Sequence, residues 1–415
     1  MIKKSYILVP FFLIVGLSIG FFFKIDPSGG SYKDFISVWK YIIELNSDFS
    51  VLYNKKLGID NTLLHYPLHY LLVSRFDIFI QNKEFFLKTF FIISIFLPFI
   101  FYKCLAIKFQ NVEKKYLVFL ASLIYLFPAY QSAAIWGNSH ITALYFLLFS
   151  IFFYLKWEKE KKNSLNINII LQVTFLALAA YTRQSYVILF PFFFLRYIKY
   201  LKIKNFIYLS LFTILLSIPG IIFLKLNPML LWFDSNTTNF LSSILVVSSI
   251  LCFNLIPFLL ILLLTNIQFV RKKFFNNLTI FNLFLSIIIV VILSQNFIYI
   301  DNIGGGIFLK LSRYIFKNEI FFFLSSALGI FFLLSIINNK IENLLLVFIL
   351  LLSFSSGFYI FHKYFEPMFL IILFCLFDKE ITENFLKSKI FLAYIYFATY
   401  LCAAIIQSQY NIIKF

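Results

Sequence analysis

Two aspartates near the beginning of the chain have the residue type and the surroundings for acid–base chemistry. Asp34 follows the turn-forming stretch PSGG, residues 27–30, and lies at the expected start of a helix. A carboxylate there could act as a general base, could bind a metal ion, or could simply be favoured by the helix dipole. Asp26 precedes the same turn and is the rival carboxylate. We predict that one of the two, with Asp34 preferred, is a catalytic base.

The four histidines of the chain are His65, His69, His140 and His362, and all of them lie between or at the ends of apolar stretches. His65 and His69 are four positions apart, so a continuous helix would place them on one face. Pro67 lies between them, and a proline breaks a helix locally. The HExxH arrangement of zinc proteases is missing as well. We therefore predict that these histidines bind a phosphate or a sugar hydroxyl, with ordinary interfacial histidines as the alternative.

A second group of polar residues suits an anionic substrate. Arg183 and Gln184 lie between two apolar runs with almost no loop, where an arginine is costly unless it is paired or solvated. A guanidinium can bind two oxygens of a phosphate at once. We predict a phosphate contact here, against the alternative of an arginine that reaches the lipid headgroups. The stretch WGNSH, residues 136–140, is small, polar and aromatic, and suits the wall of a binding site or a simple turn.

Two later segments carry further cations. A lysine and an arginine three positions apart follow three glycines, residues 304–306, whose amides could form an anion-binding nest or a flexible loop. The segment HKY, residues 362–364, ends another apolar run, where it could grip an anionic lipid headgroup or form an ordinary aromatic belt. We predict substrate contacts from five side chains of these segments: Lys310, Arg313, His362, Lys363 and Tyr364.

The composition defines the kind of protein that must position these residues. Hydrophobic residues make up 61% of the 415 positions and charged residues 13%, and the mean hydropathy is +0.91. A water-soluble domain of this size could not keep so much apolar surface from water, so the composition indicates a lipid-embedded protein. The four cysteines occur singly in or beside apolar runs, without the spacing of a metal site.

About thirteen apolar runs are long enough, or nearly so, to cross a membrane, among them 116–133 and 185–199. With the N-terminus in the cytoplasm, the inside segments hold 21 of the 36 basic residues and 7 of the 18 acidic ones. This bias follows the positive-inside rule and explains the net charge of +18 without a nucleic-acid partner. We expect an all-α polytopic protein with about 11–13 transmembrane helices in one membrane domain, residues 1–415. The first run, 5–23, is expected to be retained rather than cleaved as a signal peptide.

The unusual segment is the first extracytoplasmic loop, residues 24–85, which is the largest connection between apolar runs. Its apolar positions recur at helical spacing between charged ones: Phe35, Val38, Trp39, Ile42 and Ile43. This pattern predicts an amphipathic helix on the membrane surface with its aromatic face in the lipid headgroups. The stretch 63–80 is apolar but interrupted by polar residues, so we expect it to enter a protein-lined cavity.

These features together resemble the GT-C class of integral-membrane glycosyltransferases, which includes mannosyl-, glucosyl- and arabinosyltransferases that use dolichol- or undecaprenyl-phosphate sugars. The resemblance covers the architecture of most of the chain: a first span, an acid on a surface helix, a large first outer loop and a basic-aromatic-Pro motif outside a late span. The segment YTRQ, residues 181–184, is similar to the Arg-Gln segment of the dolichol-linked glucosyltransferases. The segment HKY, residues 362–364, is similar to a basic-Tyr motif near the lipid phosphate.

The resemblance implies that an acid of the first outer loop acts as the base or holds a metal, and Asp34 matches best, with Asp26 as the rival. The adjacent pair of acids typical of the class is replaced by Lys33-Asp34, which leaves a divalent metal open as a cofactor. The implied reaction transfers a sugar from a polyprenyl-phosphate donor to a glycan or lipid acceptor, at the extracytoplasmic face of a bacterial inner membrane. The cations available to stabilise the leaving phosphate are Arg183, Lys310, Arg313 and Lys363.

Two other functions compete with this interpretation. An O-antigen-type polysaccharide polymerase or ligase has a similar number of spans, but it usually carries its large outer loop late in the chain. A lipid-linked glycan flippase or another transporter would place charges within spans and show internal repeats, and the sequence has neither. Polar residues gathered beneath the first loop would favour a transferase, whereas a polar path through the protein would favour a transporter.

Overall fold

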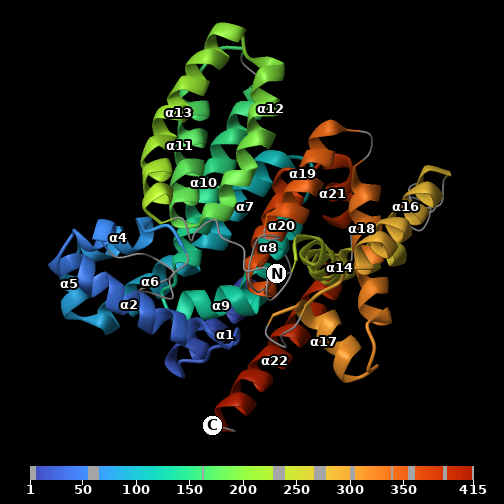
Figure 1. The fold of residues 1–415 in the computed structure, drawn as a ribbon, viewed down its shortest axis with the longest axis horizontal. Coiled ribbons are helices and arrows are strands. Elements are labelled where there is room, and N and C mark those ends of the chain that lie inside the picture. The colour runs from blue at the N-terminus through green and yellow to red at the C-terminus, as the bar shows by residue number, and fades with distance from the viewer. Residues whose placement is uncertain are drawn as a thin grey trace. The chain divides into compact units, whose positions relative to one another are not determined.

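The computed structural model describes residues 6–54, 65–160, 163–227, 239–265, 277–299, 304–337, 340–353, 360–386 and 390–413. Every regular element within these ranges is helical, and the same ranges contain no β-strand (Figure 1). The prediction of an all-α fold is therefore confirmed.

The chain divides into two compact units, residues 1–232 with 397–415 and residues 233–396, and each is described by itself. The first unit contains α1 (Leu8–Phe22), α2 (Ser31–Ser47), α3 (Val51–Asn54), α4 (Leu68–Ser74), α5 (Asp77–Gln81), α6 (Lys83–Ile95), α7 (Leu97–Lys108), α8 (Lys114–Ser122), η2 (Leu123–Leu126), α9 (Pro128–Ile135), α10 (Ser139–Glu160), α11 (Ile167–Thr182), η3 (Gln184–Leu189), α12 (Phe190–Tyr200) and α13 (Ile203–Leu226). The second unit contains α14 (Phe240–Thr265), α16 (Asn277–Ser294), α17 (Gly306–Tyr314), α18 (Ile320–Ile336), α19 (Ile341–Leu352), η5 (His362–Tyr364), α20 (Met368–Cys375) and α21 (Lys379–Leu386). Helix α22 (Phe391–Ile413) begins in the second unit and continues in the first.

Several helices have the length and the composition of membrane spans. Five described stretches qualify: Lys83–Lys108, Ser139–Glu160, Ile203–Leu226, Phe240–Leu264 and Phe391–Gln409. Five shorter apolar helices have 10–17 residues: Leu8–Phe22, Ile167–Thr182, Thr279–Ser294, Ile320–Ile336 and Ile341–Leu352. The chain is thus an all-α protein with several helices that could cross a membrane. The higher count of 11–13 spans, the single domain and the cytoplasmic N-terminus stay predictions.

Residues 116–133, one of the apolar runs predicted to be long enough to span, do not form one straight helix. Helix α8 with η2 and helix α9 meet at a bend of 68°. The bend lies at Phe127, whose backbone is extended (φ −80°, ψ 123°) because the following Pro128 excludes the helical conformation of its predecessor. The run 185–199 is interrupted in a similar way, since a 3-10 turn, η3, precedes the α-helix α12 near Pro191.

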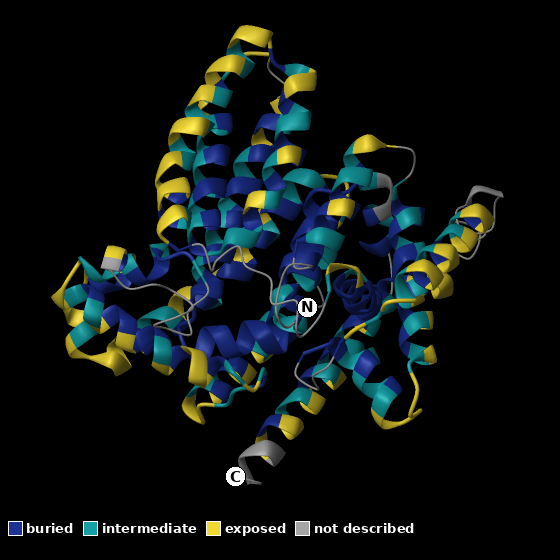
Figure 2. Cartoon of the chain, in the orientation of Figure 1, coloured by how far each residue is buried: buried dark blue, intermediate teal, exposed yellow. Residues whose placement is uncertain are grey.

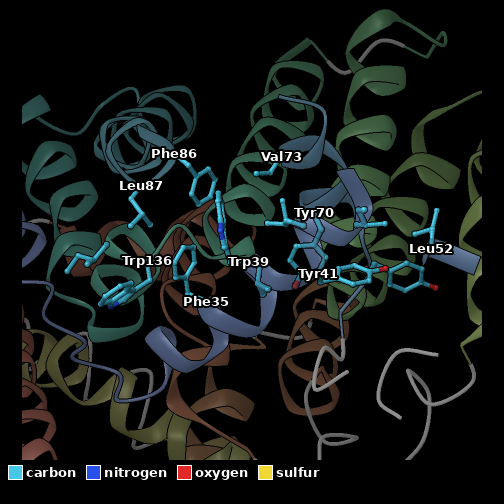
Figure 3. Close-up of a cluster of buried hydrophobic side chains, with 14 of the residues drawn as sticks. Phe35, Trp39, Tyr41, Leu52, Tyr70, Val73, Phe86, Leu87 and Trp136 are labelled. Atoms are coloured by element: carbon cyan, nitrogen blue, oxygen red, sulfur yellow. The ribbon is translucent and has the colours of Figure 1, made fainter. Parts of the chain in front are cut away.

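Helix α2 confirms the predicted amphipathic helix of the first loop but corrects its surroundings. Phe35, Trp39 and Ile42 are buried in one apolar cluster with residues of α4, α6 and the segment after α9 (Figure 3). The ring of Phe35 stacks on that of Phe86 at 6.3 Å between centroids, and it lies 6.0 Å from Trp136. The aromatic face of α2 therefore packs against protein and not among lipid headgroups, because the later part of the loop folds into α4 and α5 and supplies apolar partners.

In the first unit, α10 and α11 pack together and share a buried polar network with α12. The side-chain amide of Gln172 donates from Nε2 to Ser150 Oγ (3.0 Å) and accepts at Oε1 from Tyr197 Oη (2.8 Å). Such hydrogen bonds join helices in a lipid environment. Helix α13 is different. Only 17% of the residues in its most apolar stretch are buried, and its outer side is exposed along most of its length (Figure 2).

Helix α14 is the central helix of the second unit, and 83% of the residues in its most apolar stretch are buried (Figure 2). Helix α18 packs against it at a glycine: a Cβ added to Gly329 would collide with the carbonyl oxygen of Ser248. Small residues of this kind let two helix backbones approach closely in membrane proteins.

Candidate functional site

The predicted base, Asp34, lies in the first turn of α2 and is exposed. Residues four and seven positions later, Val38 and Tyr41, are buried, and this spacing places all three on one side of the helix. The ring of Tyr41 meets the ring of Tyr70 on α4 edge to face, with 5.8 Å between centroids (Figure 3). Asp34 therefore lies on the side of α2 that faces α4, one helical turn before Val38.

Tyr70 is a buried residue whose pKa is affected by both Asp34 and Arg183. Burial raises the pKa of its hydroxyl above the ordinary value, and the negative charge of Asp34 raises it further. A hydrogen bond with the Ser139 side chain and the positive charge of Arg183 lower that pKa. The predicted base and the predicted phosphate-binding cation thus act on the same phenol with opposite signs. The fold brings α2, α4, the start of α10 and the end of α11 together at this point.

Arg183 follows α11 with an extended backbone, and its side chain is partly buried. Its Nε is inaccessible to solvent and has no hydrogen-bond partner, and no ion pair of its guanidinium is found within the described ranges. A partly buried cation without a carboxylate is costly in a membrane protein. An anion supplied from outside the chain would compensate it. Gln184 follows directly as the first residue of η3.

His69 is almost fully buried (1% exposed), and its Nδ1 lies 2.9 Å from Thr142 Oγ1 on α10. Burial lowers the pKa of His69 to about 3, and the charge of Arg183 lowers it as well, although the backbone carbonyl of Gly137 opposes both. The imidazole is therefore neutral at physiological pH. It lies beside Tyr70, with 5.5 Å between ring centroids.

The expectation that Pro67 separates the first two histidines is confirmed. Helix α4 begins at Leu68 with Pro67 as its N-cap, so His65 precedes the helix and shares no face with His69. His140, the second residue of α10, is buried (5% exposed). Among the described residues, no group of three or more His, Cys, Asp and Glu side chains has the arrangement of a metal site.

Asp26 has a structural role in the turn before α2. Its Oδ1 accepts from Ser28 Oγ (3.1 Å) and its Oδ2 accepts from the Tyr32 amide (3.0 Å), which holds the turn before α2. The amide of Ser28 in turn donates to Ser132 Oγ on α9 (2.8 Å). Both carboxylate oxygens of Asp26 thus stabilise the start of α2.

We call Asp34, His69, Tyr70, Ser139 and Arg183 the polar cluster. The connection between α9 and α10, residues 136–140, supplies Ser139 to it. The Trp136 ring lies 4.7 Å from that of Tyr32 on α2. Trp136 Nε1 and Asn138 Oδ1 are buried without a hydrogen-bond partner within the described chain. The indole nitrogen of Trp136 can donate, and the amide oxygen of Asn138 can accept, a hydrogen bond with a group from outside the chain, such as water.

Gly137 allows this connection to form, and we expect its replacement to be costly. Its φ is +60°, and a Cβ there would lie 2.7 Å from Phe86 Cε1. The Gly137→Ala variant should lose about 1–3 kcal/mol of stability through backbone strain alone, which a lower thermal unfolding temperature in detergent would show. Gly16→Ala on α1 is the control, because nothing lies within 4 Å of its added Cβ and alanine favours a helix. Equal unfolding temperatures for both variants would contradict this expectation.

The remaining predicted site residues lie in the second unit. His362 Nε2 accepts a hydrogen bond from the Ile307 amide (3.0 Å) and so caps the start of α17. Burial lowers the pKa of His362 to about 3, and the charge of Lys310 lowers it as well. Burial also lowers the pKa of Lys310 itself. Lys310 and His362 are therefore close to each other, as a joint anion site would require.

The other cations of the second unit are differently placed. Arg313 Nε and Nη2 donate to Glu319 Oε1 at 3.0 and 2.6 Å, so its charge is compensated within the chain. Lys363 lies over the ring of Phe361, 5.1 Å from the centroid. Tyr364 ends the short turn η5 and is partly buried.

The amide of Gly305 is not available to the anion-binding nest that the glycines could form. The residues before the glycines, 301–303, lie outside the described ranges. Gly304, Gly305 and Gly306 are buried with φ of 74°, 74° and 80°. The Gly305 amide donates to the Ile360 carbonyl (2.9 Å), and the next helical amide binds His362. These donors are used to join two parts of the unit, so they are not available to an external anion.

Sequence reasoning missed the residues that link the predicted ones. Tyr70, Ser139 and Thr142 contact His69 or join the charges of the site, but nothing in their spacing marks them. The first group of predicted residues is brought together in the first unit and the second group in the second unit. A single site formed by both groups stays a prediction.

No protein-family model matches the chain, and the comparisons with curated proteins and with solved structures gave no match either. The function is therefore argued from the geometry of the polar cluster.

Proposed function

We propose that the chain is a membrane glycosyltransferase that moves a sugar from a polyprenyl-phosphate donor to an acceptor hydroxyl. One observation carries the proposal: α4 packs both against α2, which carries the exposed carboxylate of Asp34, and against α11, whose end carries Arg183 without an ion-pair partner among the described residues. A base and an uncompensated cation on helices that meet at one neighbour suit transfer from a phosphate ester.

In this mechanism Asp34 accepts the proton of the acceptor hydroxyl while the acceptor oxygen attacks the anomeric carbon. A new glycosidic bond forms, and the bond between the anomeric carbon and the donor phosphate oxygen breaks. The phosphate leaves with the electron pair of that bond, and Arg183 stabilises its added negative charge. The reaction yields the glycosylated acceptor, free polyprenyl phosphate and protonated Asp34.

The neighbouring groups support these two roles. Because the pKa of Tyr70 is raised, its hydroxyl stays protonated and can donate a hydrogen bond without competing with Asp34 as a base. Neutral His69 adds no second cation beside Arg183. The described residues around Asp34 do not supply the three ligands of a metal site, so no step is routed through a metal.

The membrane context supports a lipid-linked donor over a soluble one. Helix α10 has the length and composition of a membrane span and begins at Ser139 of the cluster, so it would hold the tail of a polyprenyl phosphate beside its headgroup. The extracytoplasmic location of the site, a bacterial inner membrane and a glycan or lipid acceptor belong to the same proposal.

The test is a transfer assay with the full chain in lipid nanodiscs. A panel of polyprenyl-phosphate hexoses and pentoses is supplied with a membrane glycan and lipid extract, and release of polyprenyl phosphate is measured. We expect release of polyprenyl phosphate from at least one lipid-linked donor, and no release of nucleotide when the matching nucleotide sugars are supplied instead. Movement of an intact donor across the bilayer without release would indicate a flippase. Consumption of pyrophosphate-linked oligosaccharides alone would indicate a polymerase, and either result would overturn the proposal.

A further inference from the structure

One end of the first unit carries a dense group of lysines that the proposed reaction does not use. We call it the lysine cluster: Lys156, Lys159, Lys199, Lys202 and Lys204, all of which are exposed. They lie near the C-terminal ends of α10 and α12 and at the N-terminal end of α13.

Hydrogen bonds show that these helix ends are close together. Arg196 on α12 forms an ion pair with Glu158 on α10, and its Nε also donates to Tyr154 Oη (3.1 Å). The Lys202 amide and the side-chain amide of Asn205 both donate to the Asn163 carbonyl, each at 3.3 Å. The ends of α10, α12 and α13 are thus fixed at one level.

The cluster has little negative charge to balance it. The described residues of these ends, 150–160, 163–166 and 196–208, contain two carboxylates, Glu158 and Glu160. Glu158 is used by Arg196, which leaves one carboxylate among five lysines. The excess positive charge calls for an anionic partner.

The lysine side chains lie near aromatic rings, as is common for lysines at a membrane interface. The ammonium of Lys156 lies 4.5 Å from the ring centroid of Phe152, and that of Lys204 lies 5.8 Å from the ring of Tyr208. Lys199 lies 6.0 Å from the ring of Tyr200. Exposed lysines whose ammonium groups lie near aromatic rings are typical of residues at headgroup level.

Helix α13 supplies an apolar track that begins at the cluster. Its exposed residues recur at intervals of three or four on one face: Ile203, Ile207, Leu211, Ile214, Ile218 and Ile221. From the first to the last of these, the track is about 27 Å long at about 1.5 Å per residue, close to the hydrocarbon thickness of a bilayer of about 30 Å. The opposite side of α13 faces protein, where Tyr66 Oη donates to the Gly220 carbonyl (3.1 Å). One face is therefore left for lipid.

We propose that this end of the unit is a binding site for an anionic phospholipid, with acyl chains along the exposed face of α13 and the phosphate at Lys199, Lys202 and Lys204. The charge excess selects an anionic headgroup over a zwitterionic one. The site is independent of the proposed reaction, because none of its residues belongs to the polar cluster around Asp34.

Native mass spectrometry of the full chain, with phosphatidylglycerol and phosphatidylcholine of identical acyl chains, tests this site. We expect phosphatidylglycerol to bind preferentially to the unaltered chain. The double variant Lys202→Gln/Lys204→Gln should weaken that binding by about fivefold per lysine removed. Lys40→Gln/Lys88→Gln, on α2 and α6, is the matched control with the same loss of charge, and it should keep the preference.

The charge-conserving variant Lys202→Arg/Lys204→Arg guards against a folding defect and should bind phosphatidylglycerol as the unaltered chain does. Equal binding of the two lipids by the unaltered chain would overturn the proposal. An equal loss in the control variant would also overturn it, since the effect would then reflect net charge. A dimer that covers α13 and excludes lipid in the same spectra would replace the lipid by a second copy.

Discussion

Replacing Asp34 by asparagine is expected to lower the rate of sugar transfer by a factor of about 10²–10⁴, the usual contribution of a general base. Asparagine keeps the size and the hydrogen-bonding capacity of the side chain but cannot take the acceptor proton. Because Asp34 is exposed in the first turn of α2, the fold loses little from the change. Release of polyprenyl phosphate from the lipid-linked donor is the measurement, at saturating donor and acceptor.

The same helix offers a matched control for this variant. Asp48 follows α2 and accepts hydrogen bonds from the Ser50 amide (2.8 Å) and hydroxyl (2.7 Å), away from the polar cluster. Asp48→Asn should transfer at the rate of the unaltered chain. If Asp34→Asn keeps its activity and Asp26→Asn loses it in a folded protein, Asp26 is the base and our assignment is wrong.

Replacing Arg183 by glutamine should separate stability from activity. Its guanidinium has no carboxylate partner within the described chain, so the variant should unfold at the same or a higher temperature. The transfer rate should fall by about 10²–10³, as when one group that stabilises a developing charge is removed. The Michaelis constant for the lipid donor should rise as well, because the phosphate is also bound before reaction.

Arg196 provides the opposite case for comparison. It is paired with Glu158 and donates to Tyr154, and its side chain is 15% exposed. Arg196→Gln should therefore destabilise the fold by about 1–3 kcal/mol and change the transfer rate little in the protein that remains folded. If Arg183→Gln behaved in the same manner as Arg196→Gln, Arg183 would be a structural residue.

The local features of the fold were predictable where one residue or one period decides them. The 3–4 spacing of Phe35, Trp39 and Ile42 determines which face of α2 is buried. Pro67 and the proline after Phe127 act on their immediate neighbours, so the helix breaks there follow from backbone sterics. The break at Phe127 does not follow from hydropathy, because residues 116–133 are apolar on both sides of the proline.

Contacts over long sequence separations were not predictable from the same patterns. The bond between His69 and Thr142 joins residues 73 positions apart, and Tyr70 meets Ser139 over a similar separation. The hydrogen-bond partners of the glycine amides were not predictable for a related reason. A run of glycines indicates positive φ, but it does not tell whether the amides face an external anion or another segment, here Ile360.

The burial of α2 against protein also decides how the proposed base responds to its lipid environment. A helix that lay among the lipid headgroups would change its position relative to the rest of the protein when acyl chains of different length changed the thickness of the bilayer. Asp34 instead lies on a helix whose inner face is buried with α4 and α6. Near the C-terminal end of this helix, the side-chain amide of Asn46 donates a hydrogen bond to the Ser74 carbonyl (2.9 Å). The separation of Asp34 from Arg183 should consequently be the same in thin and thick bilayers.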